Sequence, residues 1–399
     1  MLCLVLSVFG IEGCGPREPQ KASSLLPFMF SVDPTTWESS DLNGAAQIVL
    51  PLENEMPPQV IDYWNAAYPS YRWHQIMMRA GLNHNGHKNG GRMAILHLAI
   101  YDALAASQNA DQRSTVAAAS HTIISHYFPE QQPWLDSLLM EHQKVQLTDK
   151  TSTVAQIQQG TAIGRAIARK YIEYAATDNT NKVWKGTVPK DPKLWSGTPN
   201  PYDPTKKNWK PLTLTSNDQF RPPPPPEDWS ADMQELRDFY KEHSSSDIAW
   251  KWKSEPIWDM LLERKILEYG LDAETAAYVS AVFHAARFDA TIAAWDGKYH
   301  YWGIRPFQYD PSFQPILTTP NFPGYPAGHT TVAGALARVL SHFFPHDAKQ
   351  FEDLAKECSE SRFEGGVHFR TDNEVGLQVG DQVGQHVIQA FGGGIPTPR

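Results

Sequence analysis

From about residue 61 onward, the apolar residues of this chain recur at spacings of three and four, and few stretches alternate between apolar and polar residues. Spacings of three and four place side chains on one face of an α-helix, whereas alternation is typical of a half-buried β-strand. The segment from Met93 to Ala106 is apolar nearly all round, which predicts a buried helix. The pattern therefore predicts an all-α fold with little sheet.

Capping residues, prolines and glycines predict where the other helices begin and end. We expect a helix over 153–176 and a long helix that begins after the N-cap Asp272 and runs through Trp295. In the C-terminal part, the predicted helices are 330–344, a segment opened by Asp347, and 373–391. Valines repeat every four residues in the last helix, with small residues beside them that predict close approach of another helix: Gly376, Gly380 and Gly384.

The 399 residues divide into four segments by composition. Residues 1–14 are signal-like, and 15–60 form a Pro- and polar-rich extended lead-in. Residues 61–229 are predicted to form an N-terminal helical layer that ends in a long Pro/Trp-rich loop, and 230–399 a C-terminal helical layer. The tryptophans of the loop predict that it packs on the body of the protein, while the run Pro222 to Pro226 predicts a stiff polyproline spacer.

The first eleven residues form an apolar stretch that is shorter than the roughly 20 residues needed to span a bilayer. The stretch resembles the hydrophobic part of a secretory signal, and with Cys14 after it the segment resembles a bacterial lipoprotein signal, although no Lys or Arg precedes it. The resemblance implies export, with Cys14 as a lipid anchor in the periplasm or on the outer surface of a bacterium. The alternative is an N-terminal segment whose cysteine has no role.

Charge and cysteine content limit the classes of function. Lys and Arg number 35 against 44 Asp and Glu, so the formal net charge is −9. An acidic chain is a poor partner for nucleic acid or an anionic membrane surface. Three cysteines can form neither a disulfide framework nor a four-cysteine zinc site. Any binding of an anion therefore has to depend on a local cluster of cations.

Three segments of the C-terminal third supply such a cluster: 298–306, 325–331 and 361–372. Arginine offers a planar fork suited to oxyanions and lysine a point charge, while a glycine before a helix lets backbone N–H groups approach an anion. Three neighbouring cations repel a divalent metal ion, which prefers carboxylate or thiolate ligands. The combination predicts a site for a tetrahedral oxyanion such as phosphate or vanadate. The candidate residues are Lys298, Arg305, Gly328, His329, Arg362 and His368.

These residues form the pattern Lys-x6-Arg-Pro, Pro-x-Gly-His and Ser-Arg-x5-His-x3-Asp without gaps. The pattern resembles the signature shared by the vanadium-dependent haloperoxidases and the type-2 phosphatidic acid phosphatases. The resemblance is strong over about residues 289–391, and it is weaker over 93–106 and the Trp/Pro-rich middle. It implies an all-α fold of two helical layers with long loops.

The resemblance implies vanadate as cofactor, phosphate as its competitor, and hydrogen peroxide and halide as substrates. His368 would bind vanadium through a ring nitrogen, and His329 would take a proton from hydrogen peroxide while halide leaves as hypohalous acid. Asp372 has two interpretations that stay open: support of His368, or an N-cap of the last helix. The oligomeric state is also left open. The groups that would neutralise the anion's oxygens are Lys298, Arg305, the Gly328 amide and Arg362.

The chain departs from the family pattern at Ala327, where the family usually has serine. The serine hydroxyl bonds an oxygen of the bound anion, whereas an alanine leaves only the backbone N–H of this segment. Loss of one hydrogen bond typically weakens binding by roughly 0.5–1.5 kcal/mol, and by more when the acceptor is charged. The departure therefore predicts weaker binding of the anion.

The shared signature does not separate peroxidase from phosphatase, because vanadate and phosphate have similar shape and charge. About 230 residues precede the signature helices, and no membrane helix is evident. Trp295 and Phe322 resemble the aromatic residues of the halide pocket in chloroperoxidases, with core packing as the alternative. These features favour the peroxidase. In the phosphatase alternative, His368 becomes a nucleophile that forms a phospho-histidine and His329 protonates the leaving group. A third alternative is a degenerate protein that only binds phosphate.

Overall fold

The structure is a computed structural model that describes residues 56–81, 89–107, 110–197, 200–254 and 256–393. All regular elements within these ranges are α-helices or short 3₁₀ turns, and no strand occurs there. The predicted all-α fold is therefore confirmed. The signal-like segment with Cys14 and most of the lead-in lie outside the described residues.

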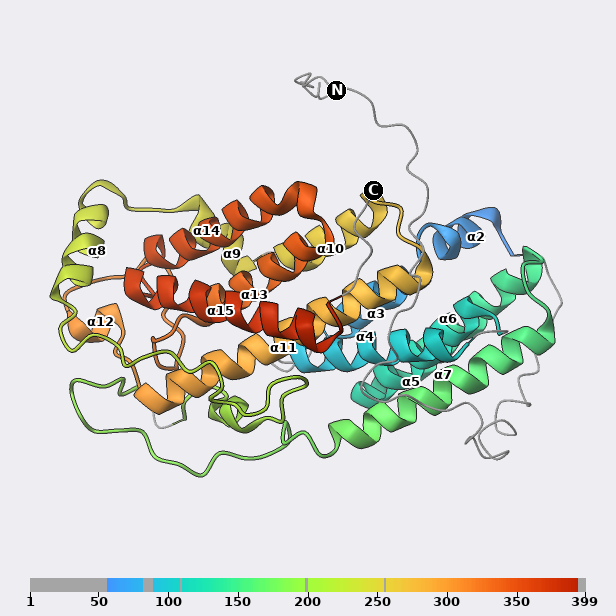
Figure 1. Ribbon diagram of the computed structural model, residues 1–399, viewed down its shortest axis with the longest axis horizontal. Coiled ribbons are helices and arrows are strands. Elements are labelled where there is room, and N and C mark those ends of the chain that lie inside the picture. The colour runs from blue at the N-terminus through green and yellow to red at the C-terminus, as the bar shows by residue number, and fades with distance from the viewer. Residues whose placement is uncertain (1–55, 82–88, 108–109, 198–199, 255, 394–399) are drawn as a thin grey trace, which may run out of the picture.

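Two groups of helices lie on either side of a long central helix (Figure 1). The N-terminal group consists of α2 (Pro58–Asn65), α3 (Tyr71–Gly81), α4 (Asn89–Ala106), α5 (Gln112–Tyr127), α6 (Gln132–Thr148) and α7 (Val154–Ala175). The central helix is α11 (Ala273–Tyr301), which belongs by sequence to the C-terminal group. The other helices of this group are α8 (Ser230–Glu242), α9 (Asp247–Ser254), α10 (Ile257–Glu268), α12 (Pro306–Tyr309), α13 (Gly328–Phe343), α14 (Ala348–Glu364) and α15 (Arg370–Ala390).

The central helix α11 joins the two groups. It packs against α4 of the N-terminal group and against α13 and α15 of the C-terminal group. A single hydrophobic core runs through these contacts, from Trp64 near the N-terminal end to Phe391 after α15. No helix in the described ranges combines the length and the apolar character that a bilayer crossing requires.

The predicted helix starts are confirmed where a side chain caps the backbone. Thr153 and Gln156 form a capping box at α7, and the Asp272 carboxylate accepts from the N–H of Thr275 at 2.8 Å. The predicted end of α11 at Trp295 is wrong, because the helix continues to Tyr301 and ends at the left-handed Trp302. Lys298 therefore lies on the last turn of this helix.

Two other predicted starts differ from the structure. The last helix begins at Arg370, three residues before the predicted start at 373. Asp347 precedes α14 but makes no side-chain cap. Its carboxylate instead accepts from Tyr269 and forms an ion pair with Lys265. The Asp347 carboxylate is therefore bonded to residues far away in the sequence and not to the first N–H groups of α14.

The predicted close approach of glycine-bearing α15 to another helix is confirmed against α13. A Cβ at Gly380 would overlap the carbonyl oxygen of Thr331 and lie 2.9 Å from the backbone nitrogen of Ala335. Only a residue without a side chain fits at this distance. The two backbones are thus in direct contact two residues after His329.

The Pro/Trp-rich loop 176–229 packs on α11, as its tryptophans predict. Trp195 and Trp209 are buried. The Asp289 carboxylate of α11 accepts from the N–H groups of Leu212 and Thr213, both at 2.8 Å. The loop is thereby attached to the helix that carries Lys298.

The proline run at the end of this loop is attached to the body of the protein at its first two residues, while Pro223, Pro224 and Pro226 have exposed side chains. Arg221 forms a two-pronged salt bridge with Asp296 of α11, at 2.6 and 2.8 Å. The hydroxyl of Tyr301 donates to the carbonyl of Pro222, and that of Tyr325 to the carbonyl of Pro223. These contacts hold the run against the end of α11 and against the residues that lead into α13.

Candidate active site

Four segments that are far apart in the sequence meet at the predicted oxyanion site. They are the last turn of α11, the residues before α12, the loop into α13, and the turn between α14 and α15. The backbone N–H of Ala327 donates to the carbonyl of Asp372 at 2.9 Å, which joins the last two segments. The Tyr325–Pro326 peptide bond in the loop is cis.

Lys298 is fully buried, and two backbone carbonyls fix its ammonium group. Its Nζ donates to Pro323 O at 2.9 Å and to Gly324 O at 2.6 Å. An ammonium has three donors, so a third hydrogen remains for a ligand. Burial first and Arg305 second hold the pKa of Lys298 well below its ordinary value, while Asp372 acts in the opposite direction. An anion beside it would favour the charged form.

Arg305 is fully buried, and one of its three guanidinium nitrogens is unpaired among the described residues. Its Nε donates to Phe322 O at 3.1 Å, and its Nη1 donates to Val367 O and to His368 Nε2, the latter at 2.9 Å. Its Nη2 has no hydrogen-bond partner among the described residues. Burial lowers the pKa of Arg305 to about 10. A buried guanidinium nitrogen without an acceptor is the donor that an oxyanion would satisfy.

His368 is held between Asp372 and Arg305, and these partners determine its tautomer. Its Nδ1 lies 3.0 Å from Asp372 Oδ2, and its Nε2 lies 2.9 Å from Arg305 Nη1. A carboxylate only accepts and a guanidinium only donates, so Nδ1 carries the hydrogen and Nε2 the lone pair. Burial, followed by Arg305 and the other nearby cations, keeps the pKa of His368 well below its ordinary value. The ring is therefore neutral, and the lone pair of Nε2, which accepts from Arg305, can act as a nucleophile or ligand when this hydrogen bond is given up.

The structure supports the first interpretation of Asp372, and the N-cap interpretation is wrong, because α15 begins at Arg370 with Phe369 as its N-cap and Asp372 is the third residue of the helix. Its Oδ2 accepts from His368 and also, at 3.2 Å, from the backbone N–H of Phe369, so it stabilises the start of α15 from inside the helix. Its Oδ1 has no partner in the described part of the chain. Burial raises the pKa of Asp372 to about 7, and Arg305 and Lys298 oppose this rise.

Arg362, on the last turn of α14, is the third cation. It is 4% exposed, and its Nε donates to Ser361 Oγ at 3.0 Å while Nη2 donates to Ala249 O at 2.9 Å. The Ser-Arg pair of the motif is thus a positioning device, in which the serine orients the guanidinium of the next residue. Burial lowers the pKa of Arg362.

The N-terminus of α13 lies beside Lys298. Ala327 is fully buried and occupies the N-cap position without a side-chain hydrogen bond. A Cβ at Gly328 would lie 3.1 Å from the Trp295 ring and 3.4 Å from Cε of Lys298. Glycine therefore brings the first N–H groups of the helix, which lack partners within it, close to the cations.

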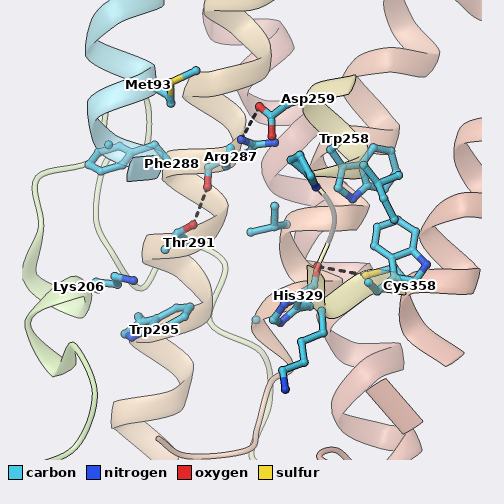
Figure 2. Close-up of a pocket in the computed structure, with 18 of the residues that line it drawn as sticks. Met93, Lys206, Trp258, Asp259, Arg287, Phe288, Thr291, Trp295, His329 and Cys358 are labelled. Atoms are coloured by element: carbon cyan, nitrogen blue, oxygen red, sulfur yellow. Dashed lines mark hydrogen bonds and ion pairs between the residues drawn. The ribbon is translucent and has the colours of Figure 1, made fainter. Parts of the chain in front are cut away.

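His329 opens into a cavity of about 460 Å³ together with Trp295 and Phe322. Figure 2 shows Trp295 of α11 and His329 of α13 on facing sides of this cavity. The Trp295 and Phe322 ring centroids are 5.4 Å apart, and Phe322 also lies over Lys298, whose Nζ is 5.2 Å from its centroid. The two aromatic residues thus form a wall of the cavity beside Lys298, and both also belong to a small buried aromatic cluster, so the halide-pocket and core-packing interpretations both stay predictions.

The pKa of His329 is lowered to about 3, first by desolvation and then by Arg362, Lys298 and Arg305. The side chain itself is exposed toward the cavity. The three cations are therefore the part of this shift that a bound anion would reverse. Without an anion, His329 is neutral near pH 7 and can accept a proton.

Sequence reasoning missed other residues of this cavity. Lys206 is buried, forms an ion pair with Asp203 at 3.2 Å, and has its Nζ 4.4 Å from the Trp295 ring centroid. Asp259 and Arg287 form a 2.8 Å ion pair on the cavity wall (Figure 2). Single charged residues in a loop or on a helix have no recognisable spacing, so no signal in the sequence indicated them.

The donors present fit a tetrahedral oxyanion. Arg305 bonds Nε2 of His368, Lys298 and Arg362 are near enough to lower the pKa of its ring, and one guanidinium nitrogen of Arg305 is buried without an acceptor among the described residues. Oδ2 of Asp372 is paired with His368, so this oxygen is not free to bind a metal ion. This set matches vanadate or phosphate in charge and hydrogen-bonding capacity.

Comparison with known proteins gives relatives of the same fold. Residues 348–392 match the family model of the VCPO second helical-bundle domain. The chain is similar to the structure of a protein described as the first bacterial vanadium-dependent iodoperoxidase. The TM-score is 0.69 and the sequence identity 22%, and the match covers 84% of this chain and 98% of that chain. No curated protein matches the sequence.

Two structures of a bacterial vanadium-dependent chloroperoxidase are also similar. The holo-type structure has TM-score 0.60 and 16% identity, covering 76% of this chain and 90% of the other. The apo-type structure has TM-score 0.64 and 16% identity, covering 76% of this chain and 92% of the other. The resemblance predicted from the motifs is thereby confirmed, and the fold is that of the bacterial vanadium haloperoxidases.

Proposed function

We propose that this chain, which has the fold of the vanadium haloperoxidases, is a vanadate-dependent haloperoxidase that oxidises halide with hydrogen peroxide to hypohalous acid. The observation that carries the proposal is the arrangement around His368. Asp372 fixes the hydrogen on Nδ1, and Nε2 points its lone pair to the buried Arg305, whose Nη2 lacks a partner within the described residues.

Each residue of the site has a role that follows from its geometry. His368 Nε2 would be the vanadium ligand, and Lys298, Arg305, Arg362 and the α13 N-terminus would hold the charged oxygens. Bound vanadate would supply a Lewis acid that activates peroxide without a change in its oxidation state. His329 would accept a proton from incoming hydrogen peroxide, because its ring is neutral and opens into the cavity. Trp295 and Phe322 would exclude water from the halide side.

The test is a pair of assays on the full-length protein. After removal of bound anions, orthovanadate is added, and halogenation of a phenol dye is measured with peroxide and with chloride, bromide or iodide in turn. We expect turnover that depends on vanadate and is suppressed by excess phosphate. Release of phosphate from p-nitrophenyl phosphate, without vanadate-dependent halogenation, would show that the phosphatase is the correct function. Binding of phosphate without either activity would support the degenerate protein.

The variant Ala327→Ser should strengthen anion binding. A serine at this buried N-cap position adds a hydroxyl that can bond the anion or cap α13. One hydrogen bond of roughly 0.5–1.5 kcal/mol corresponds to an affinity gain of about 2- to 12-fold. Titration with vanadate measures the gain, and the melting temperature without vanadate measures the cap. An unchanged affinity together with a higher melting temperature would mean that the hydroxyl caps the helix and does not reach the anion.

The pH dependence should identify the role of His329. Its pKa is about 3 without ligand, and a bound anion would raise this pKa toward the ordinary value near 6.5. If His329 accepts a proton, kcat/KM for peroxide should be highest above this pKa and fall as the pH decreases through it. If it donates a proton, as in the phosphatase, the rate should instead rise as the pH decreases. His329→Gln should remove this limb and reduce the rate by about 10²- to 10⁴-fold.

A further inference from the structure

Three histidines from three different helices meet in the core, away from the oxyanion site. His74 comes from α3, His97 from α4 and His284 from α11, and all three are nearly or fully buried. Each histidine has one ring nitrogen that lies within 4.8 Å of a ring nitrogen of each of the other two. His74 Nδ1 is 2.9 Å from His97 Nε2, and the His97 and His284 rings stack with centroids 4.3 Å apart.

The cluster has more hydrogen-bonding capacity than it uses. Both ring nitrogens of His284 and Nδ1 of His97 are buried with no partner among the described residues. A fourth group, Glu263 of α10, has its Oε1 3.8 Å from His74 Nε2, and this oxygen is likewise without a hydrogen bond in the described ranges. Buried polar atoms in native proteins are almost always paired, so four unpaired atoms in one part of the core indicate that partners are missing there.

Burial leaves the imidazoles neutral. It lowers the pKa of His74 to about 4 and holds the pKa values of His97 and His284 well below the ordinary value. Arg287, on the same helix as His284, acts in the same direction, but its guanidinium is paired with Asp259 of α10 at 2.8 Å. Burial and Asp259 raise the pKa of Glu263 to about 7, and Arg72 opposes this rise.

We propose that His74, His97 and His284 form a binding site for a zinc-class divalent cation. Three neutral imidazoles are a known ligand set for Zn²⁺ and leave the fourth tetrahedral position for water or another small ligand. Glu263 would support the site from outside by accepting from Nε2 of His74, while Nδ1 of His74 binds the metal. This site differs from the oxyanion site in its ligands, which are imidazoles without a cluster of cations among the described residues.

The three rings are close enough to share a metal, but the stacked rings of His97 and His284 have to turn so that their lone pairs converge. Zn–N bonds of about 2.0–2.1 Å in a tetrahedron place neighbouring nitrogens about 3.4 Å apart. His74 and His97 are already closer than this, and His284 has to approach within the 4.8 Å limit. The 2.9 Å hydrogen bond between the first two rings would be replaced by two metal bonds.

The position of the site gives it a structural role. His284 and Lys298 lie 14 residues apart on α11, about 21 Å along a helix that rises 1.5 Å per residue. The metal would join α3 and α4 of the N-terminal group to α11 of the C-terminal group. It would thus fix the central helix that presents Lys298, without taking part in the proposed peroxidase reaction. The inference does not depend on that reaction.

The test measures zinc binding to the full-length protein after treatment with a chelator. We expect one equivalent of Zn²⁺ to bind and to raise the melting temperature, since a ligand that binds only the folded state stabilises it. Co²⁺ in place of zinc should show the absorption of a tetrahedral ion. His284→Gln should weaken zinc binding on the order of 100-fold or more, since even outer-shell changes weaken metal sites 10- to 100-fold.

Two further variants separate loss of ligation from loss of folding. Glu263→Gln removes the carboxylate from a partly exposed position and should weaken zinc binding while the melting temperature of the metal-free protein stays close to that of the wild type. His142→Gln is the matched control, because His142 is also buried and neutral but bonds Trp73 outside the cluster. It should bind zinc like the wild type. The proposal is wrong if the wild type binds no zinc, or if His284→Gln and Glu263→Gln both bind zinc as tightly as the wild type. Either result would show that the histidines are only a hydrogen-bonded part of the core.

Discussion

Replacement of His368 by alanine is expected to abolish vanadate binding and halogenation together. The substitution removes the nitrogen that we propose as the vanadium ligand and leaves Arg305 and Asp372 without the imidazole that both contact. We expect the affinity for vanadate to fall by at least about 100-fold, because changes to outer-shell residues alone cost 10- to 100-fold. Titration with vanadate, followed by the change in the ⁵¹V signal, measures the loss directly.

Asp372→Asn distinguishes the two roles of this carboxylate. The amide oxygen can still accept from the Phe369 N–H, so the start of α15 should remain intact. The amide no longer carries the charge that selects the Nδ1–H tautomer, and its NH₂ group can donate to Nδ1 instead. We expect vanadate affinity or kcat to fall about 10- to 100-fold with little change in melting temperature.

Asp381→Asn is the control for this comparison. Asp381 lies on the same helix, but it pairs with Arg338 near the surface, where an ion pair contributes at most about 1 kcal/mol. Its vanadate affinity should equal that of the wild type. Wild-type affinity in Asp372→Asn as well, with a lowered melting temperature, would show that Asp372 serves only to stabilise the start of α15.

The second large effect is expected for Gly380→Ala. The added Cβ would overlap the carbonyl oxygen of Thr331, and it meets backbone, which cannot rotate away. Helices α13 and α15 would have to separate. Overpacking of this kind lowers the free energy of unfolding by about 1–3 kcal/mol and occasionally more, and we expect the upper end because the contact is backbone to backbone. Urea unfolding measures the loss.

The same substitution in Gly90→Ala provides the control. Gly90 lies in α4, and a Cβ there would meet nothing within 4 Å. Alanine should leave the protein as stable as before or up to about 1 kcal/mol more stable, because glycine is the poorer helix former. Because Thr331 is two residues from His329, Gly380→Ala should also weaken vanadate binding. An unchanged urea midpoint in Gly380→Ala would mean that the two helices are not in the contact described.

Much of this fold is local and could be predicted. Helix positions followed from apolar spacing, and Asp272 and Thr153 cap their helices as expected because a cap bonds a backbone N–H only a few residues away. The predicted end of α11 at Trp295 was wrong by six residues. That end depends on the packing of Gly297 against Pro326 and of the proline run against α11, which local pattern does not record.

The sequence predicted which residues form the candidate site, but not the hydrogen bonds and ring contacts that hold them. Motif spacing brought Lys298, Arg305 and His368 into one hypothesis, and the structure places them together. The spacing could not say that the carbonyls of residues 323 and 324 hold the lysine ammonium, or that Phe322 covers two of the cations. These contacts join groups that no periodic pattern links.

The sequence alone determined the helical class, the positions of most helices and the cations and histidines of the oxyanion site, because all of these depend on spacings of a few residues. Only the tertiary structure decided which nitrogen of His368 carries the lone pair, since Asp372 and Arg305 reach it from two directions. It also decided that His74, His97 and His284 meet, because three helices separated by up to 210 residues converge there only when the core is packed. Contacts of that kind arise from folding and have no counterpart in local pattern.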